Sequence, residues 1–171
     1  TDALTGLLNK VYAEYTISEW LREKDFEDLQ ALMMIDMDYF KQINDTYGHA
    51  TGDQVLKIFA GFLKEQFRAT DIIGRVGGDE FMILMKNVRL DYSIHLHLQK
   101  LYTNLQNIDI PELNDQKLSC SIGCAVAPTD AESFSQLYRL ADHALYTAKH
   151  NGRGRFVIYH DIKNQQETVL S

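Results

Sequence analysis

Cysteines and long hydrophobic runs are scarce in this sequence. The first scarcity argues against a disulfide-bonded protein, and the second argues against a membrane-spanning segment in this chain. The 171 residues include only two cysteines, Cys120 and Cys124. On an extended strand their Cα atoms would lie roughly 13 Å apart, which is too far for a disulfide. We therefore expect a reduced, cytoplasmic setting for this domain. No apolar run reaches the length of a membrane-spanning helix.

Positive charge is also in short supply. The chain has 17 Lys and Arg residues against 24 Asp and Glu residues, which gives a net charge of −7. This balance disfavours a duplex nucleic acid bound through a broad basic face. A polyphosphate ligand would need metal ions to offset the acidic side chains. The composition is otherwise that of a globular protein, and the length suits a single domain.

Hydrophobic periodicity predicts an α+β fold, with a central, mainly antiparallel sheet flanked by helices. We expect helices near residues 10–24, 40–45, 53–68, 92–106 and 134–149. Strands are expected near residues 31–35, 72–76, 81–85, 118–126 and 155–159. We assign residues 1–160 to one domain and expect residues 161–171 to form a polar, frayed C-terminal tail.

Acidic residues gather at two points of this predicted sheet. The pair Gly77-Gly78 separates two apolar runs and predicts a hairpin, with Asp79 and Glu80 at its mouth. Asp36 ends the strand predicted at 31–35, and alternation places Asp38 on the same side. If these strands pair, the carboxylates of Asp36 and Asp79 converge, and they repel each other unless a cation lies between them. Oxygen ligands favour Mg²⁺ or Mn²⁺, as two-metal phosphoryl transfer requires. The alternative is a set of solvated residues at strand ends.

Several motifs occur in an order that resembles the GGDEF domain of the diguanylate cyclase family. They are residues 2–9, 36–45, 47–53, 77–81 and 141–149, and the resemblance extends from Asp2 to about Tyr159. It implies a sheet like the palm of nucleotide cyclases and polymerases. It also implies condensation of two GTP molecules into cyclic di-GMP, with release of two pyrophosphates. The reaction would occur between two domains of a homodimer, with two Mg²⁺ or Mn²⁺ ions in each half-site.

The resemblance also implies roles for individual residues. The metal ligands would be Asp36, Asp79, Glu80 and the backbone carbonyl of Met37. The catalytic residues would be Asp79, Glu80 and Lys41, and either carboxylate could accept the 3′ proton. The substrate-binding residues would be Phe40, Asn44, His49, Asp53, Lys149 and Arg153.

Within the substrate-binding set, three kinds of role are implied. Asn44 and Asp53 would read guanine, because a carboxylate accepts hydrogen bonds from guanine that adenine cannot donate. Lys41, Lys149 and Arg153 would hold the phosphates, whereas Phe40 would pack beneath the site. His49 fits either a nucleotide contact or packing beside Gly48.

Two further positions are of interest outside the reaction centre. Arg68 and Asp71 match the family's inhibitory site for cyclic di-GMP, where Arg grips a phosphate and Asp reads a guanine edge. The alternative is a helix-terminal Arg beside a surface Asp. Arg75 would serve either the phosphates or an acidic neighbour. The sequence departs from the family at Lys10, where Arg is usual, and at Gly154, where Asn is common.

Three functions compete on these residues: an active cyclase, a module that binds GTP or cyclic di-GMP without turnover, and a different palm-type nucleotidyl transferase. The intact acidic and basic residues favour the first. Because the chain starts inside a motif, we expect an excised domain that normally follows a sensory or regulatory domain. We also expect His95 and His97 to lie at the surface without acidic partners.

Overall fold

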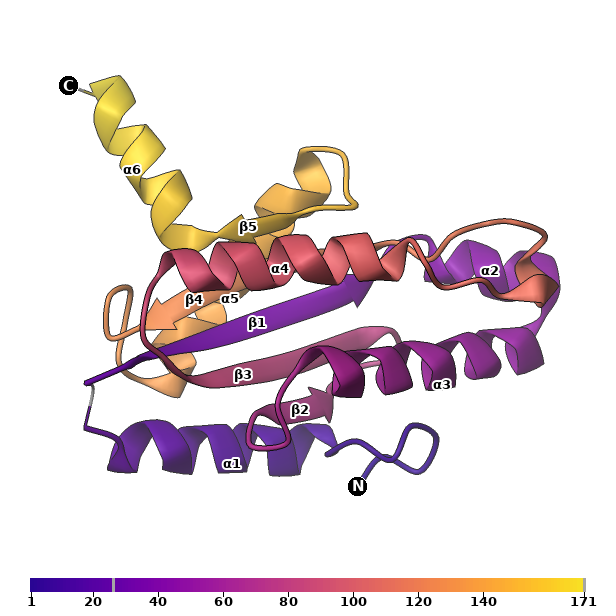
Figure 1. The fold of residues 1–171 in the computed structure, drawn as a ribbon, viewed down its shortest axis with the longest axis horizontal. Helices are drawn as coiled ribbons and strands as arrows, with labels where there is room; N and C mark the ends of the chain where they lie inside the picture. The colour runs from indigo at the N-terminus through magenta and orange to yellow at the C-terminus, as the bar shows by residue number, and fades with distance from the viewer. Residues whose placement is uncertain (26, 171) are drawn as a thin grey trace.

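A five-stranded sheet runs through the part of the chain that the structure describes (Figure 1). The structure is a computed structural model that describes residues 1–25 and 27–170, with side chains through Asn164. The strand order is β2-β3-β1-β4-β5. The strands are β1 (Leu29–Met37), β2 (Ile72–Arg75), β3 (Glu80–Val88), β4 (Cys120–Ala127) and β5 (Phe156–Ile158). All neighbours pair antiparallel except β4 and β5, so the sheet is mainly antiparallel as predicted.

Helices cover both faces of this sheet. They are α1 (Lys10–Glu23), α2 (Phe40–Tyr47), α3 (His49–Gln66), α4 (Tyr92–Leu105), α5 (Phe134–His150) and α6 (Tyr159–Leu170), with a 3₁₀ turn at Pro111–Leu113. Alternating side chains of β1 serve two separate cores. Met33 and Ile35 pack with residues of α3 and α4, whereas Leu32 and Met34 pack with residues of α1 and α5. Burial on both faces explains why β1 is an unbroken apolar run.

Local signals fix several element boundaries. The Asn9 side chain accepts a hydrogen bond from the backbone nitrogen of Tyr12 and so caps α1. Gly48 has φ 91°, which other residues rarely adopt, and this turn separates α2 from α3. Gly123 lets α5 lie directly on β4, because a Cβ there would overlap the backbone of Ala141 and Leu145.

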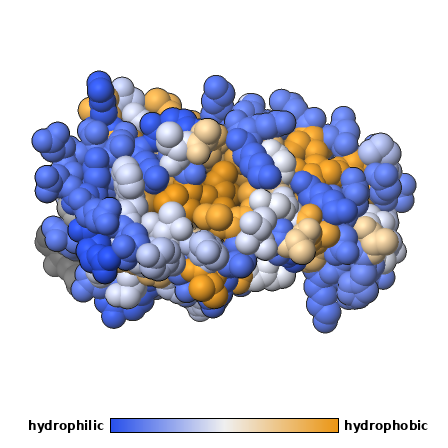
Figure 2. Space-filling view, turned by 90° about the horizontal axis from the view of Figure 1, so that it is seen from below, coloured by the Kyte–Doolittle hydropathy of each residue, from blue (hydrophilic) through white to orange (hydrophobic). Residues whose placement is uncertain are grey.

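Seen from the side on which α1 lies, the surface is largely hydrophilic, with hydrophobic side chains gathered near its middle (Figure 2).

Two expectations are wrong, one about residues 161–170 and one about His95. Residues 161–170 continue helix α6 instead of forming a frayed tail, and α6 projects from the sheet beside β5 (Figure 1); residue 171 lies outside the described residues. His95 does have an acidic partner, because its Nε2 lies 2.8 Å from Oδ2 of Asp161. His160 contacts the carboxylates of Asp91 and Asp130. These long-range pairs fix the first turn of α6, which explains why the local sequence did not reveal the helix.

Two other observations concern the cysteines and the helices. Cys120 and Cys124 are both free thiols buried in β4, in agreement with the prediction that they do not pair. Throughout residues 1–25 and 27–170, no helix is both long enough and apolar enough to cross a membrane.

Candidate active site

The C-terminal end of β1 and the turn between β2 and β3 lie at the same end of the sheet, beside α2 (Figure 1). Asp36 pairs with Glu80 across the β1–β3 register. The backbone nitrogen of Met37 donates to the carbonyl oxygen of Asp79 at 3.1 Å. The Asp36 and Asp79 carboxyl groups lie close enough that Asp36 raises the pKa of Asp79 both by its charge and by hydrogen bonding. The structure therefore brings together the two carboxylates that the sequence placed 43 positions apart (79 − 36).

This proximity changes the charge state of Asp79. Burial, the negative charge of Asp36 and the hydrogen bond with Asp36 together raise the pKa of Asp79 to about 6. Lys149, near the end of α5, forms an ion pair with Oδ2 of Asp36. The Asp36 side chain is only 13% exposed, so water screens this pair weakly. The ammonium group of Lys149 therefore offsets part of the repulsion between the two carboxylates, and below about pH 6 a proton on Asp79 offsets more of it.

The donor set suits a hard divalent cation. Asp36, Asp79 and the carbonyl of Met37 offer oxygen atoms, and Mg²⁺ is usually held by one or two carboxylates together with water and substrate phosphates. Among the residues the structure describes, three or more acidic, His or Cys side chains do not surround any single point.

Glu80 differs from its neighbour. Its side chain is exposed and folds over Gly77, where an added Cβ would lie 2.6 Å from Oε2 of Glu80. Its charge contributes to the raised pKa of Asp79, but less than burial and Asp36 do. A side chain at position 77 would displace this carboxylate, which explains on steric grounds why the first residue of the pair is glycine.

Arg75 holds the turn in place. Its Nε donates to the carbonyls of Gly77 and Gly78 at 3.2 and 3.1 Å, and its Nη2 donates to Gly78 at 2.8 Å. Both carboxylate oxygens of Asp2 accept from Nη1 of Arg75 at 3.2 Å. Burial alone would raise the pKa of Asp2, but hydrogen bonds from Thr5 and Arg75 lower it overall. Of the two roles open for Arg75, the structure supports the acidic neighbour, and Asp2 is a site residue that local sequence reasoning missed.

The basic residues expected at the phosphates lie around the first turn of α2. Lys41 is exposed in that turn, and Phe40 packs against the hydrophobic core. The guanidinium of Arg153 lies 5.7 Å from the centre of the Tyr39 ring. Tyr39 is the residue that precedes α2, and it has a left-handed backbone with φ 59°. Lys149 lies on the same side through its ion pair with Asp36.

The residues expected at guanine lie on α2 and α3. A Cβ added at Gly52 would overlap the amide oxygen of Asn44, so Asn44 reaches across to the first turn of α3. Asp53 follows Gly52 directly and is exposed, as is His49 at the start of α3. Asn44 and Asp53 therefore lie in adjacent turns of two neighbouring helices, with the Asp53 carboxylate open to solvent.

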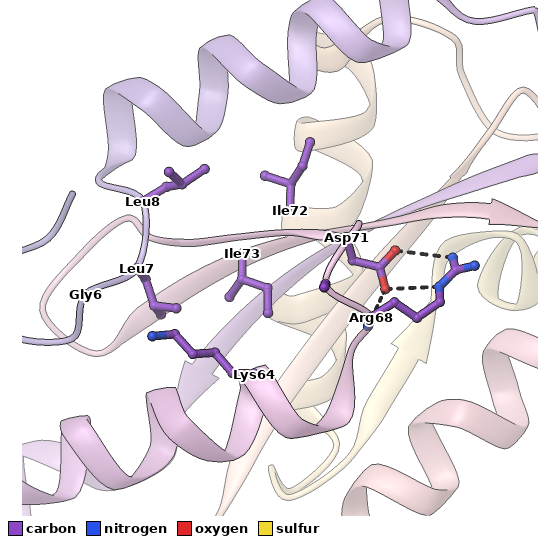
Figure 3. A pocket seen from close by; sticks show the side chains of 9 residues that line it. Gly6, Leu7, Leu8, Lys64, Arg68, Asp71, Ile72 and Ile73 are labelled. Carbon is purple, nitrogen blue, oxygen red and sulfur yellow. Dashed lines mark hydrogen bonds and ion pairs between the residues drawn. The ribbon is translucent and has the colours of Figure 1, made fainter.

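The expected inhibitory residues, Arg68 and Asp71, precede β2, at the opposite end of that strand from the Gly77-Gly78 turn, and both line a pocket of about 460 Å³ (Figure 3). The Asp71 side chain is only 1% exposed, and it accepts hydrogen bonds at 2.9 Å from the backbone nitrogens of Arg68 and Lys86. The alternative of a surface aspartate is therefore wrong. The Arg68 side chain is 53% exposed and pairs with Asp71 at 3.2 Å. In Figure 3, Lys64 extends toward Leu7, whereas the Arg68 guanidinium lies beyond Asp71.

Comparison with known proteins agrees with this geometry. The sequence pattern of the family described as "Diguanylate cyclase, GGDEF domain" matches residues 1–155. Probable diguanylate cyclase DgcT of Escherichia coli is 35% identical over 168 residues, which cover 95% of this chain and 36% of DgcT. This chain thus spans about a third of that relative.

Solved structures agree as well. The GGDEF domain of PA1120 (TpbB or YfiN) from Pseudomonas aeruginosa superposes with a TM-score of 0.86 at 32% identity, covering 96% of this chain and 98% of that one. The GGDEF domain of DgcB from Caulobacter crescentus, solved in complex with c-di-GMP, gives a TM-score of 0.84 at 27% identity, covering 94% and 95%.

Proposed function

Because the chain belongs to the GGDEF-domain family of diguanylate cyclases, we propose that it condenses two GTP molecules into cyclic di-GMP and releases two pyrophosphates. The observation that carries this proposal is the contact between the Asp36 and Asp79 carboxyl groups at one end of the sheet. Such a pair is unfavourable without a cation and becomes useful when a metal–triphosphate complex binds.

Divalent metal ions would be held by Asp36, Asp79 and the carbonyl of Met37, with Glu80 in support. When bound, Mg²⁺ or Mn²⁺ ions neutralise charge on the triphosphate and make the attacking hydroxyl more acidic. The protein's own contribution is to hold the carboxylates rigidly, through the β1–β3 register and the grip of Arg75 on the turn. Asp79 is our first candidate for the proton acceptor, because the Glu80 carboxylate lies over Gly77.

The triphosphate would lie at the first turn of α2, among Lys41, Lys149 and Arg153. A helix N-terminus and three cations favour an anion there. Lys149 would exchange part of its ion pair with Asp36 for a phosphate contact once a metal ion binds. Phe40 would support this turn from below, because it packs on the core.

The guanine base would bind between Asn44 and Asp53, with His49 at the edge of the site. The exposed carboxylate of Asp53 suits the N1 and N2 donors of guanine, which adenine lacks. Each domain would hold one GTP, so the reaction needs a homodimer in which two sites face each other. An upstream sensory or regulatory domain would control that encounter, since DgcT is nearly three times as long as the matched region.

Product inhibition would act through Arg68. Its guanidinium is half exposed and is oriented by Asp71, which suits the capture of a phosphate or the stacking of a guanine base. The complex of the DgcB domain with c-di-GMP supports a ligand of this kind for a relative. Because Asp71 is buried, we assign it the task of holding Arg68, and the direct ligand contact falls to the arginine.

Product identification tests the proposed function. The purified chain, stripped of bound cyclic di-GMP by a specific phosphodiesterase, is incubated with GTP and Mg²⁺ at several protein concentrations. We expect cyclic di-GMP, formed at a rate that rises more steeply than protein concentration because two copies are needed. Asp36→Asn should abolish it, whereas Asp45→Asn, which removes an exposed acid from α2, should not. Bound GTP without product would indicate a binding module, and another product would indicate a different transferase.

A further inference from the structure

Asp38 is an acid whose role is separate from the carboxylate pair. It lies two residues after Asp36 and just beyond the end of β1, and its side chain is fully buried. Ser119 and Ser121 donate to its two oxygens at 2.6 and 2.7 Å. The backbone nitrogen of Gly154 donates to it at 2.9 Å. Ser121 is also the β4 register partner of Asp36, so Asp38 lies on the same side of the sheet as Asp36, as alternation predicts.

That loop has an unusual backbone. Three consecutive residues, Gly152, Arg153 and Gly154, have positive φ values of 111°, 63° and 57°. Arg153 is the demanding member, because a side chain makes this conformation unfavourable. Contacts around it must therefore hold the loop, and the Asp38 carboxylate is attached to the next peptide unit through Gly154.

The same carboxylate also attracts the Arg153 side chain. Nη1 of Arg153 lies 3.9 Å from Oδ1 of Asp38, and the guanidinium stands over the ring of Tyr39, the neighbour of Asp38. Residues 38 and 39 therefore hold both the backbone next to Arg153, through Gly154, and the Arg153 guanidinium. A buried carboxylate is costly unless donors surround it, so the two serines, the peptide and the guanidinium are held in one arrangement.

We propose that Asp38 is the positioning residue for the phosphate grip: it holds Arg153 at the first turn of α2 and so sets the affinity for the triphosphate. This inference rests on the proposed function for the identity of the ligand. It assigns the two acids of Asp36-Met37-Asp38 to different tasks, the first toward metal and the second toward the loop at 152–154. Asp38 itself touches neither substrate nor metal.

The test replaces Asp38 by Asn, which keeps the size but removes the charge and turns one acceptor into a donor. We expect the Michaelis constant for GTP and the dissociation constant of Mg²⁺-pyrophosphate, measured by calorimetry, to rise together by about tenfold. The catalytic constant and the preference for GTP over ATP should change less than threefold. Ser133→Ala, which removes the N-cap of α5 and leaves every contact of Asp38 in place, is the control: it should lower the melting temperature and leave pyrophosphate affinity unchanged.

Gly154→Ala covers the case in which Asp38→Asn does not fold. Gly154 is exposed with φ 57°, and an added Cβ would lie 3.3 Å from Oγ of Ser119, so this change disturbs the loop without emptying the buried site. It should weaken pyrophosphate binding in the same way. Unchanged pyrophosphate affinity in folded Asp38→Asn, or in Gly154→Ala if that variant replaces it, overturns the inference. A wild-type chain that binds pyrophosphate but makes no cyclic di-GMP contradicts the proposed function alone.

Discussion

Replacing Asp79 by Asn should make the metal-free protein more stable. In the native state the Asp79 carboxyl is half buried against Asp36, and its pKa is raised to about 6 from an ordinary value of 3.8. The unfolded chain is free of that repulsion. Native Asp79 therefore binds a proton more tightly than unfolded Asp79, and the native state loses stability as pH rises from about 4 to about 6. Above pH 6 the whole penalty is present.

The size of the effect follows from the pKa. A rise of about 2 in the pKa of Asp79 corresponds to a loss of about 3 kcal/mol in the free energy of unfolding if solvent screening is ignored, because each pKa unit is about 1.4 kcal/mol. Solvent screens a half-exposed group, so we expect about 1–2 kcal/mol from Asp79→Asn at pH 7.5. In a domain of this length that is a rise in melting temperature of about 2–8 °C. At pH 4 the rise should be close to zero.

The assay is thermal unfolding in chelator-containing buffer at pH 4 and pH 7.5, with Asp45→Asn as the matched control. Asp45 is an exposed acid, so its neutralisation should change stability by less than about 0.5 kcal/mol. Adding Mg²⁺ with a GTP analogue should stabilise the wild type more than Asp79→Asn and narrow the gap. A variant that is no more stable than the wild type at pH 7.5 without metal would refute the reasoning that two carboxylates repel each other at this site.

Three further predictions concern other parts of the molecule. Contact with the Asp130 carboxylate is the main reason the pKa of His160 is raised to about 9, so protonation stabilises the fold fully below pH 6.5. About 1–2 kcal/mol of unfolding free energy should be lost as the pH rises from 6.5 to about 9, and His160→Gln should remove that slope in urea titrations. Gly123→Ala should cost about 3 kcal/mol or more, because the new methyl group meets the backbone of α5, whereas Gly61→Ala, with open space around it, should be neutral or stabilising. Arg68→Ala should leave the initial rate intact and raise the cyclic di-GMP concentration needed for half inhibition at least tenfold, and an unchanged inhibition curve would exclude Arg68 from that site.

The sequence predicted most of the fold because its main elements carry local signals. The apolar run of β1, the Gly77-Gly78 turn and the break at Gly48 each determine a boundary through backbone chemistry. The α5 stripe predicts its buried face in the same way. The convergence of Asp36 and Asp79 followed from one further assumption, that the two strands pair, and that assumption is correct.

What the sequence did not reveal depends on contacts between distant residues. Helix α6 is fixed by pairs such as His95 with Asp161, which are 66 positions apart. Asp2 is linked to the Gly77-Gly78 turn through Arg75, 73 positions away. Neither pair follows a periodicity, so no local pattern predicts it. Asp38 lies on the side that alternation predicts, but its contacts with Ser121 and Gly154, 83 and 116 positions away, have no local signal either.

Metal counting with bound nucleotide tests the central claim most directly. The wild-type chain is titrated with Mn²⁺ in the presence of the slowly reacting analogue GTPαS, and bound ions are counted by electron paramagnetic resonance. We expect two ions per chain in the wild type and a loss of tight binding in both Asp36→Asn and Asp79→Asn, with Asp45→Asn unchanged. Variants that retain the wild-type number and affinity of ions would contradict the claim that these two carboxylates together hold the metal–nucleotide complex.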